Sequence, residues 1–169
     1  AISVPWRRFG TNGQRDYREG MITQQFIMAN ASSGPGAASH AFPKSMFRGE
    51  LLRDKHIQRI GVHVPLPKPD LGHDLRVELP GGVAVQPGHQ KLLVQADYSL
   101  AQVNHYQLRS MDSFLVKSAR GKVNHVNDKM GYRYWAFNDS NDEPCDLIRR
   151  YDTEVARWMA ELLSDRRLN

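Results

Sequence analysis

Cysteine and long apolar runs are almost missing from this sequence. Cys145 is the only cysteine, which excludes an internal disulfide and a metal site built from several thiolates. No apolar run approaches the roughly 20 residues that span a bilayer, and no charged segment precedes a short apolar stretch as it does in a signal peptide. We therefore expect a cytoplasmic protein without an integral membrane segment.

The composition is that of an ordinary globular protein. Apolar residues make up 40% of the sequence and charged residues 24%, which excludes the disordered class. A chain of 169 residues is long enough to bury one substantial core. We expect residues 1–169 to form a single domain.

Positive charge is concentrated in one part of the chain. Between Arg109 and Arg133 the sequence contains six basic and two acidic residues, whereas the net charge of the whole chain is only +5. Such a region is either a solvated basic face or an anion site, most simply for phosphate. A nucleic-acid-binding domain ranks last, and no nucleic-acid partner is expected, because helix-turn-helix, zinc-finger and RNA-recognition signatures are missing.

The N-terminal half predicts short strands joined by loops. Ile2, Val4 and Trp6 alternate as on a half-buried strand, so the sequence opens inside a strand, which is typical of a piece of a longer protein. The turn-rich segment "FGTNGQ" predicts a loop. The remaining expected elements are a short helix in Met21–Ala29 and strands in Lys44–Leu52, Ile57–Val64, Val83–Val85 and Leu92–Val94.

Two helices are expected in the C-terminal half. Ser110 is an N-cap residue before an apolar pattern that includes Phe114, and Gly121 predicts the end of that helix. A longer helix follows the acidic segment "NDEP" and carries an apolar stripe that predicts core or subunit packing. The stripe consists of Leu147, Ile148, Tyr151, Val155, Trp158, Met159, Leu162 and Leu163.

The stretch "VNHYQLRSMDSF" places polar side chains where a strand leads into a helix. The segment Leu100–Leu108 has extended character, so His105 is expected near the carboxyl end of a strand. Ligands of open α/β sheets bind outside such ends, and the amides that follow Ser110 favour an anion. His105 could ligate a divalent metal and Arg109 could bind phosphate, but a hydrogen-bonded structural histidine is the alternative.

Several motifs together resemble a bacterial glycosyltransferase family. "VNHYQLRSMDSFLVKSARG", "VPWRRFGTNG", "PKSMFR", "VHVP" and "FNDSNDEPCDLIRRY" occur here in the order of the C-terminal half of enzymes related to family two. That family is often found beside polysaccharide biosynthesis functions. The resemblance covers nearly the whole chain, so it carries more weight than any single short motif.

The resemblance implies the C-terminal portion of a GT-A type fold, with a mixed α/β sheet and a long final helix. Such an enzyme moves a sugar from a nucleotide-sugar donor to a saccharide or another hydroxyl acceptor, with Mn²⁺ or Mg²⁺ on the donor diphosphate. His105 is implied as a metal ligand. Arg109, Lys117 and Arg120 are implied at the diphosphate, and Trp6 and Phe9 could line the acceptor site.

The Asp-x-Asp motif of the family is missing from this sequence. In the family this motif precedes the segment that opens the chain, so we expect a fragment that is inactive alone. A catalytic base is not assigned, because Glu50, Asp54 and Asp74 are equally conceivable. A non-catalytic carbohydrate- or phosphate-binding module is the alternative function, and self-association through an exposed sheet edge is a further expectation.

Overall fold

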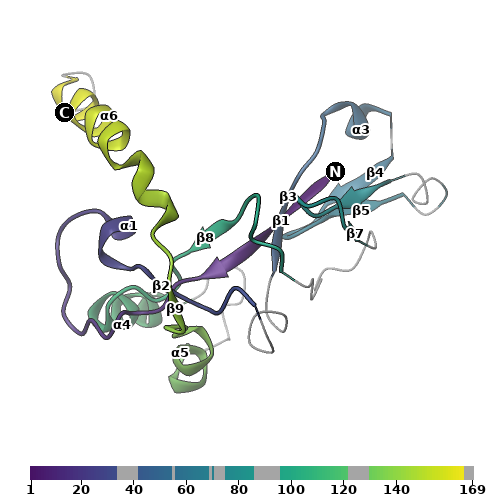
Figure 1. Cartoon of the computed structure of the whole chain (residues 1–169). Helices are drawn as coiled ribbons and strands as arrows, with labels where there is room; N and C mark the ends of the chain where they lie inside the picture. Colours follow the sequence, from purple (N-terminus) through teal and green to yellow (C-terminus); the bar gives the residue numbers. More distant parts are fainter. Residues whose placement is uncertain are drawn as a thin grey trace.

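The computed structural model describes residues 1–33, 42–54, 56–68, 70, 75–85, 96–121 and 130–165. It is a mixed α/β structure with a mixed sheet and a C-terminal helix, which confirms the coarse expectation (Figure 1). The described elements are β1 (Ile2–Arg8), α1 (Ile22–Gln25), β2 (Met28–Ala29), β3 (Pro43–Met46), α3 (Glu50–Arg53), β4 (Ile57–Ile60), β5 (Pro65–Pro67), β6 (Val77–Glu78), β7 (Ala84–Val85), β8 (Val103–His105), α4 (Met111–Arg120), α5 (Tyr132–Asn138), β9 (Glu143–Pro144), the 3-10 helix η2 (Leu147–Tyr151) and α6 (Asp152–Ser164).

Strand β1 is the centre of the sheet. It pairs antiparallel with β3, and it pairs parallel with β6 near its start and with β8 near its end. Val4 is buried and Ser3 is fully buried, so the strand is covered on both faces as expected for a central strand. Strands from three other parts of the chain therefore depend on this one segment.

Two smaller strand pairs flank the main sheet. Strand β2 pairs antiparallel with β9, and an isolated bridge joins Phe9 to Ala29 at the end of β1. Strands β4 and β5 form an antiparallel hairpin. The β2–β9 pair brings residues near position 28 against residues near position 144. Because Ala29 also forms the bridge to Phe9, this pair lies beside the end of β1.

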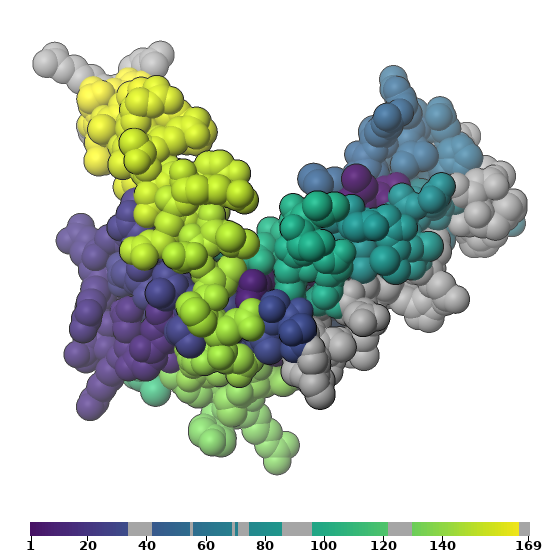
Figure 2. All heavy atoms as spheres, in the orientation of Figure 1, coloured from purple at the N-terminus to yellow at the C-terminus, as the bar shows by residue number. Residues whose placement is uncertain are grey.

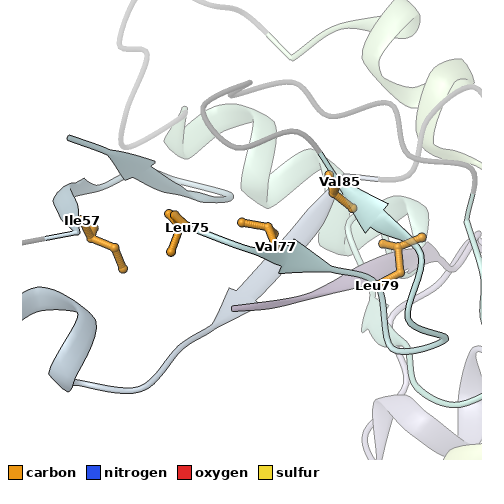
Figure 3. Packing of buried hydrophobic residues seen from close by; sticks show 5 residues of the cluster. All are labelled: Ile57, Leu75, Val77, Leu79 and Val85. Atoms are coloured by element: carbon orange, nitrogen blue, oxygen red, sulfur yellow. The ribbon is translucent and has the colours of Figure 1, made fainter. Parts of the chain in front are cut away.

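The buried apolar side chains form three small clusters. Figure 3 shows the cluster of the β-rich part, formed by Ile57, Leu75, Val77, Leu79 and Val85. A second cluster joins Phe9, Ala29 and Cys145, and a third joins Leu108, Phe114 and Met130. The core is therefore divided along the described chain rather than concentrated in one place.

Helix α4 begins and ends where the sequence predicts. The amide of Ser113 donates to Oγ of Ser110, which confirms the N-cap. Gly121 has a φ of 81° and follows the last helical residue, so the helix ends at a position that favours glycine. Phe114, on the apolar side of the helix, is its buried residue.

Other predicted boundaries are wrong in length or type. The expected helix in Met21–Ala29 is only the single turn α1 followed by β2, and the expected strand in Lys44–Leu52 ends at Met46 before α3. The expected strand over Leu100–Leu108 is limited to β8. In each case pairing with a distant segment, rather than local preference, decides the extent. Leu92–Val94 lies outside the described residues.

Helix α6 buries none of its residues. Figures 1 and 2 show α6 and η2 as an arm that diverges from the β-rich arm of the molecule. The exposed apolar residues of this arm are Leu147, Tyr151, Trp158, Met159, Leu162 and Leu163. The stripe is therefore not core packing within the described chain, and subunit packing stays a prediction. None of the described helices is long and apolar enough to cross a bilayer.

Gly10 is a position where a larger side chain should destabilise the fold. A Cβ at Gly10 would lie 2.4 Å from both the carbonyl oxygen of Ser140 and Oδ1 of Asn141. We expect Gly10→Ala to lower the free energy of unfolding by about 1–3 kcal/mol, because backbone and a hydrogen-bonded side chain must shift. Urea unfolding monitored by circular dichroism measures this change.

Gly49→Ala is the matched control for this prediction. Gly49 has helical backbone angles and no heavy atom within 4 Å of its Cβ position, so alanine should be neutral or slightly stabilising. Equal effects at Gly10 and Gly49 would contradict the close approach of Gly10 to Ser140 and Asn141.

Candidate functional site

His105 is carried to Trp6 by the pairing of two parallel strands. Trp6 is in register with Val103, and Arg8 is in register with His105. The rings of Trp6 and His105 stack with centroids 3.9 Å apart and an interplanar angle of 9°. The carbonyl oxygen of His105 accepts a hydrogen bond of 3.1 Å from the amide of Phe9, which fixes the end of β8.

Two further aromatic rings complete what we call the Trp6 cluster, which consists of Trp6, Phe42, His63 and His105. The His63 ring lies edge-on to Trp6 at 5.0 Å and 70°, and Phe42 is 5.9 Å from Trp6. The Lys44 ammonium lies 5.2 Å from the centroid of the Trp6 ring. Nε1 of Trp6 and Nδ1 of His105 are buried and have no hydrogen-bond partner within the described segments.

His105 is neutral in a positively charged environment. Burial is the main cause that lowers the pKa of His105 to about 4, and the charges of Lys117, Lys44, Arg8 and His63 lower it further. The ring is therefore unprotonated at neutral pH. The groups that shift this pKa include three basic side chains, Lys117, Lys44 and Arg8, and no carboxylate, so the site favours an anion.

Arg8 is the buried one of the basic side chains around His105, and the sequence patterns did not single it out. Its side chain is buried, and its Nη1 donates a hydrogen bond of 2.7 Å to the carbonyl oxygen of Phe137. Burial is the main cause that lowers the pKa of Arg8, while Tyr98 and the charge of Asp142 act in the opposite direction. No carboxylate among the described residues lies within ion-pair distance of Arg8. A buried guanidinium of this kind is suited to bind an anion in a bidentate way.

The neighbouring Arg7 has a structural role instead. Its guanidinium forms an ion pair with Glu143 and donates to the carbonyl oxygen of Asn30 and to Oε1 of Gln102, at 3.4 Å in both cases. It also lies 5.2 Å from the centroid of the Tyr98 ring. Arg7 is therefore committed to joining β1 to distant segments.

The three residues implied at the donor diphosphate are placed differently from one another. Nζ of Lys117 donates to the carbonyl oxygen of Gln107 at 2.7 Å and to the hydroxyl of Tyr134 at 3.1 Å. The charge of Lys117 nevertheless lowers the pKa of His105. Arg109 has a φ of 62° and lines a separate cavity of about 110 Å³. Arg120 is exposed at the last residue of α4.

The start of α4 does not offer free amides to a phosphate. The amide of Met111 donates to the carbonyl oxygen of Gln14, and the amide of Asp112 donates to that of Arg15. With Ser113 bonded to the cap, these groups already have partners within the chain. The expected anion site at this helix end is therefore not supported.

Phe9 and the candidate bases lie apart from the Trp6 cluster. Phe9 is fully buried against Ala29 and Cys145, so it offers no surface to an acceptor sugar and we assign it to the core. Glu50 and Asp54 line another cavity, of about 490 Å³, which no residue of the cluster lines. Asp74 lies outside the described residues. The catalytic base stays unassigned.

The residues that the structure describes do not make a metal site. Within the described ranges no three His, Cys, Asp or Glu side chains are grouped so that they could hold a metal ion. His105 would be a single ligand, and the cations around it repel a divalent ion. We therefore derive no step through Mn²⁺ or Mg²⁺.

No protein-family model, curated protein or solved structure was found to match the chain. Function is therefore inferred from the Trp6 cluster, from the charges around it and from the sequence resemblance.

The stability of the protein should depend on pH through His105. The folded state has a pKa of about 4 at this residue against an ordinary value of 6.5, so the unfolded chain binds more protons between these values. This contribution to the free energy of unfolding is complete above pH 6.5 and falls by about 3 kcal/mol as the pH drops to 4. Urea unfolding at several pH values measures the loss.

His105→Phe should remove this part of the pH dependence, because phenylalanine can stack on Trp6 and cannot titrate. His56→Gln, which replaces a histidine outside the Trp6 cluster, is the control and should keep it. If the His105→Phe variant showed the same pH dependence as the wild type, burial of a neutral His105 would be refuted.

Proposed function

We propose that this chain is the C-terminal part of a GT-A type glycosyltransferase domain. The full-length enzyme would transfer a sugar from a nucleotide-sugar donor to a hydroxyl of a saccharide or another acceptor. The sequence resemblance supports this reaction class. The observation that carries the proposal is the neutral His105 on Trp6, surrounded by Arg8, Lys44 and Lys117.

A diphosphate is the anion that fits this arrangement best. Its charge increases on the leaving oxygen as the bond to the sugar breaks, and fixed cations stabilise that charge without reorganisation. Arg8 is buried and so acts in a medium of low dielectric, where its attraction for phosphate is strengthened. Lys44 and Lys117 reach the same histidine from β3 and α4, so three elements supply the positive charge.

The remaining implied residues keep narrower roles in the proposal. Lys117 contributes charge while its ammonium is held by Gln107 and Tyr134. Arg109 and Arg120 stay predictions for the nucleotide or diphosphate in the complete enzyme. The partly exposed part of the Trp6 ring that His105 does not cover suits a sugar, since sugar rings pack their CH groups on aromatic faces.

We do not expect transfer by this chain alone. The Asp-x-Asp motif is missing from its sequence, and no carboxylate is among the groups that perturb the pKa of His105 or His63. That second observation also favours an alternative function, a carbohydrate- or phosphate-binding module without chemistry. The two functions differ in whether the nucleotide part of a donor adds affinity.

Binding of diphosphates to the chain tests the proposal. We expect inorganic pyrophosphate to bind at millimolar concentration, and uridine or guanosine diphosphate sugars to bind more tightly. Lys44→Met should weaken pyrophosphate binding about 10-fold, because it removes one cation beside His105. Isothermal titration calorimetry at low ionic strength measures these affinities.

Arg53→Met is the charge-matched control, because Arg53 is an exposed cation on α3 outside the Trp6 cluster. It should leave pyrophosphate affinity unchanged. Equal affinity for pyrophosphate and for all nucleotide sugars would favour the binding module. No binding of either ligand, or equal effects of Lys44→Met and Arg53→Met, would overturn the anion site.

A further inference from the structure

His63 is held beside Trp6 by contacts that fix the turn between β4 and β5 on β3. Nζ of Lys44 donates to the carbonyl oxygen of Val62 at 2.8 Å, and Oγ of Ser45 donates to that of His63 at 3.0 Å. Nδ1 of His63 lies 3.2 Å from the carbonyl oxygen of Pro43. Backbone and side chain of His63 are therefore both anchored to the central sheet.

The contact with Pro43 fixes the tautomer of His63. A carbonyl oxygen only accepts, so Nδ1 must carry the hydrogen, and Nε2 of the neutral ring is a hydrogen-bond acceptor. Burial is the main cause that lowers the pKa of His63, and the charge of Lys44 lowers it further. Lys44 and His105 are the charged or titratable groups near this ring in the described structure, and neither is a carboxylate.

The rings around this acceptor provide an apolar surface. The ring centroid of His63 lies 5.1 Å from that of Phe42 and 5.0 Å from that of Trp6, and all three side chains are partly exposed. Nε1 of Trp6 is buried, so it is not counted among the groups that a ligand meets. A sugar hydroxyl donates to an imidazole nitrogen while the CH groups of its ring pack on aromatic side chains, so a saccharide matches an acceptor between aromatic rings.

We propose that Trp6, Phe42 and His63 form a saccharide subsite in which Nε2 of His63 accepts a hydrogen bond from a sugar hydroxyl. The inference rests on the proposed function and deepens it, because it says where the sugar lies relative to the diphosphate. Both imidazoles contact the same indole, with ring centroids 3.9 Å and 5.0 Å from it. The sugar and the diphosphate are therefore neighbours across Trp6.

The hydrogen-bond acceptor at His63 also discriminates between a hydroxyl group and a phosphate group. A fully ionised phosphate oxygen has no hydrogen to donate, and it would face the lone pair of Nε2 at the cost of repulsion. His63 therefore selects the sugar end of the ligand, while Arg8, Lys44 and Lys117 attract its anionic end.

Titration of the isotope-labelled chain with monosaccharides tests the subsite. We expect glucose, galactose or N-acetylglucosamine, at up to about 100 mM, to shift the NMR signals of the His63 imidazole and the Trp6 indole. His63→Phe keeps an aromatic ring but removes the acceptor, so it should weaken binding at least 10-fold. His56→Phe, outside the cluster, should have no effect.

A second variant keeps the test decisive if His63→Phe folds poorly. His63→Gln supplies a side-chain carbonyl as an acceptor, so it should bind sugars more tightly than His63→Phe at equal thermal stability. Equal affinities of wild type and His63→Phe, or no shift with any of the three sugars, would overturn the subsite.

The test of the saccharide subsite and the test of the proposed function can fail independently, because one measures sugar binding and the other pyrophosphate binding. Pyrophosphate binding that depends on Lys44 without any sugar binding would overturn the subsite and leave the diphosphate site intact. Sugar binding without pyrophosphate binding would support the subsite as part of a carbohydrate-binding module and count against the transferase.

Discussion

The burial of the Arg7 guanidinium in the central strand is the constraint on which the rest of the structure depends. A charged group in this position is costly unless it is paired, so the chain must bring partners to it. Those partners are Asn30, Tyr98, Gln102 and Glu143, which come from widely separated segments. Pairing of Nη1 and Nη2 therefore draws the β2–β9 pair and the approach to β8 to the end of β1, whereas the buried Nε has no partner among the described residues.

The site is a consequence of that assembly. Once β8 lies beside β1, the parallel register places His105 against Arg8 and lets its ring stack on Trp6. Two adjacent arginines then have opposite tasks, since Arg7 is paired with a carboxylate and Arg8 is not paired with one in the described ranges. Division of roles between neighbours follows from the alternation of side chains along a strand.

Sequence reasoning succeeded where local chemistry decides and failed where distant segments decide. The start and end of α4 follow from Ser110 and Gly121, whose effects act within one turn. The short extent of β8 and the burial of Phe9 depend on partners far along the chain. Arg8 could have been noticed as the second of two adjacent arginines at the end of the strand that opens the chain. His63 had no such signal, because its position depends on a loop docking on β3.

The exposed state of α6 has a consequence for the dynamics of the molecule. A 13-residue helix with no buried residue is held mainly by its own hydrogen bonds, and isolated helices of that length are marginal in water. Its amides should therefore exchange with solvent through local opening, at a free energy well below that of the sheet. The two arms would then behave as separate cooperative units, and only the arm that contains β1 would report the global stability of the fold.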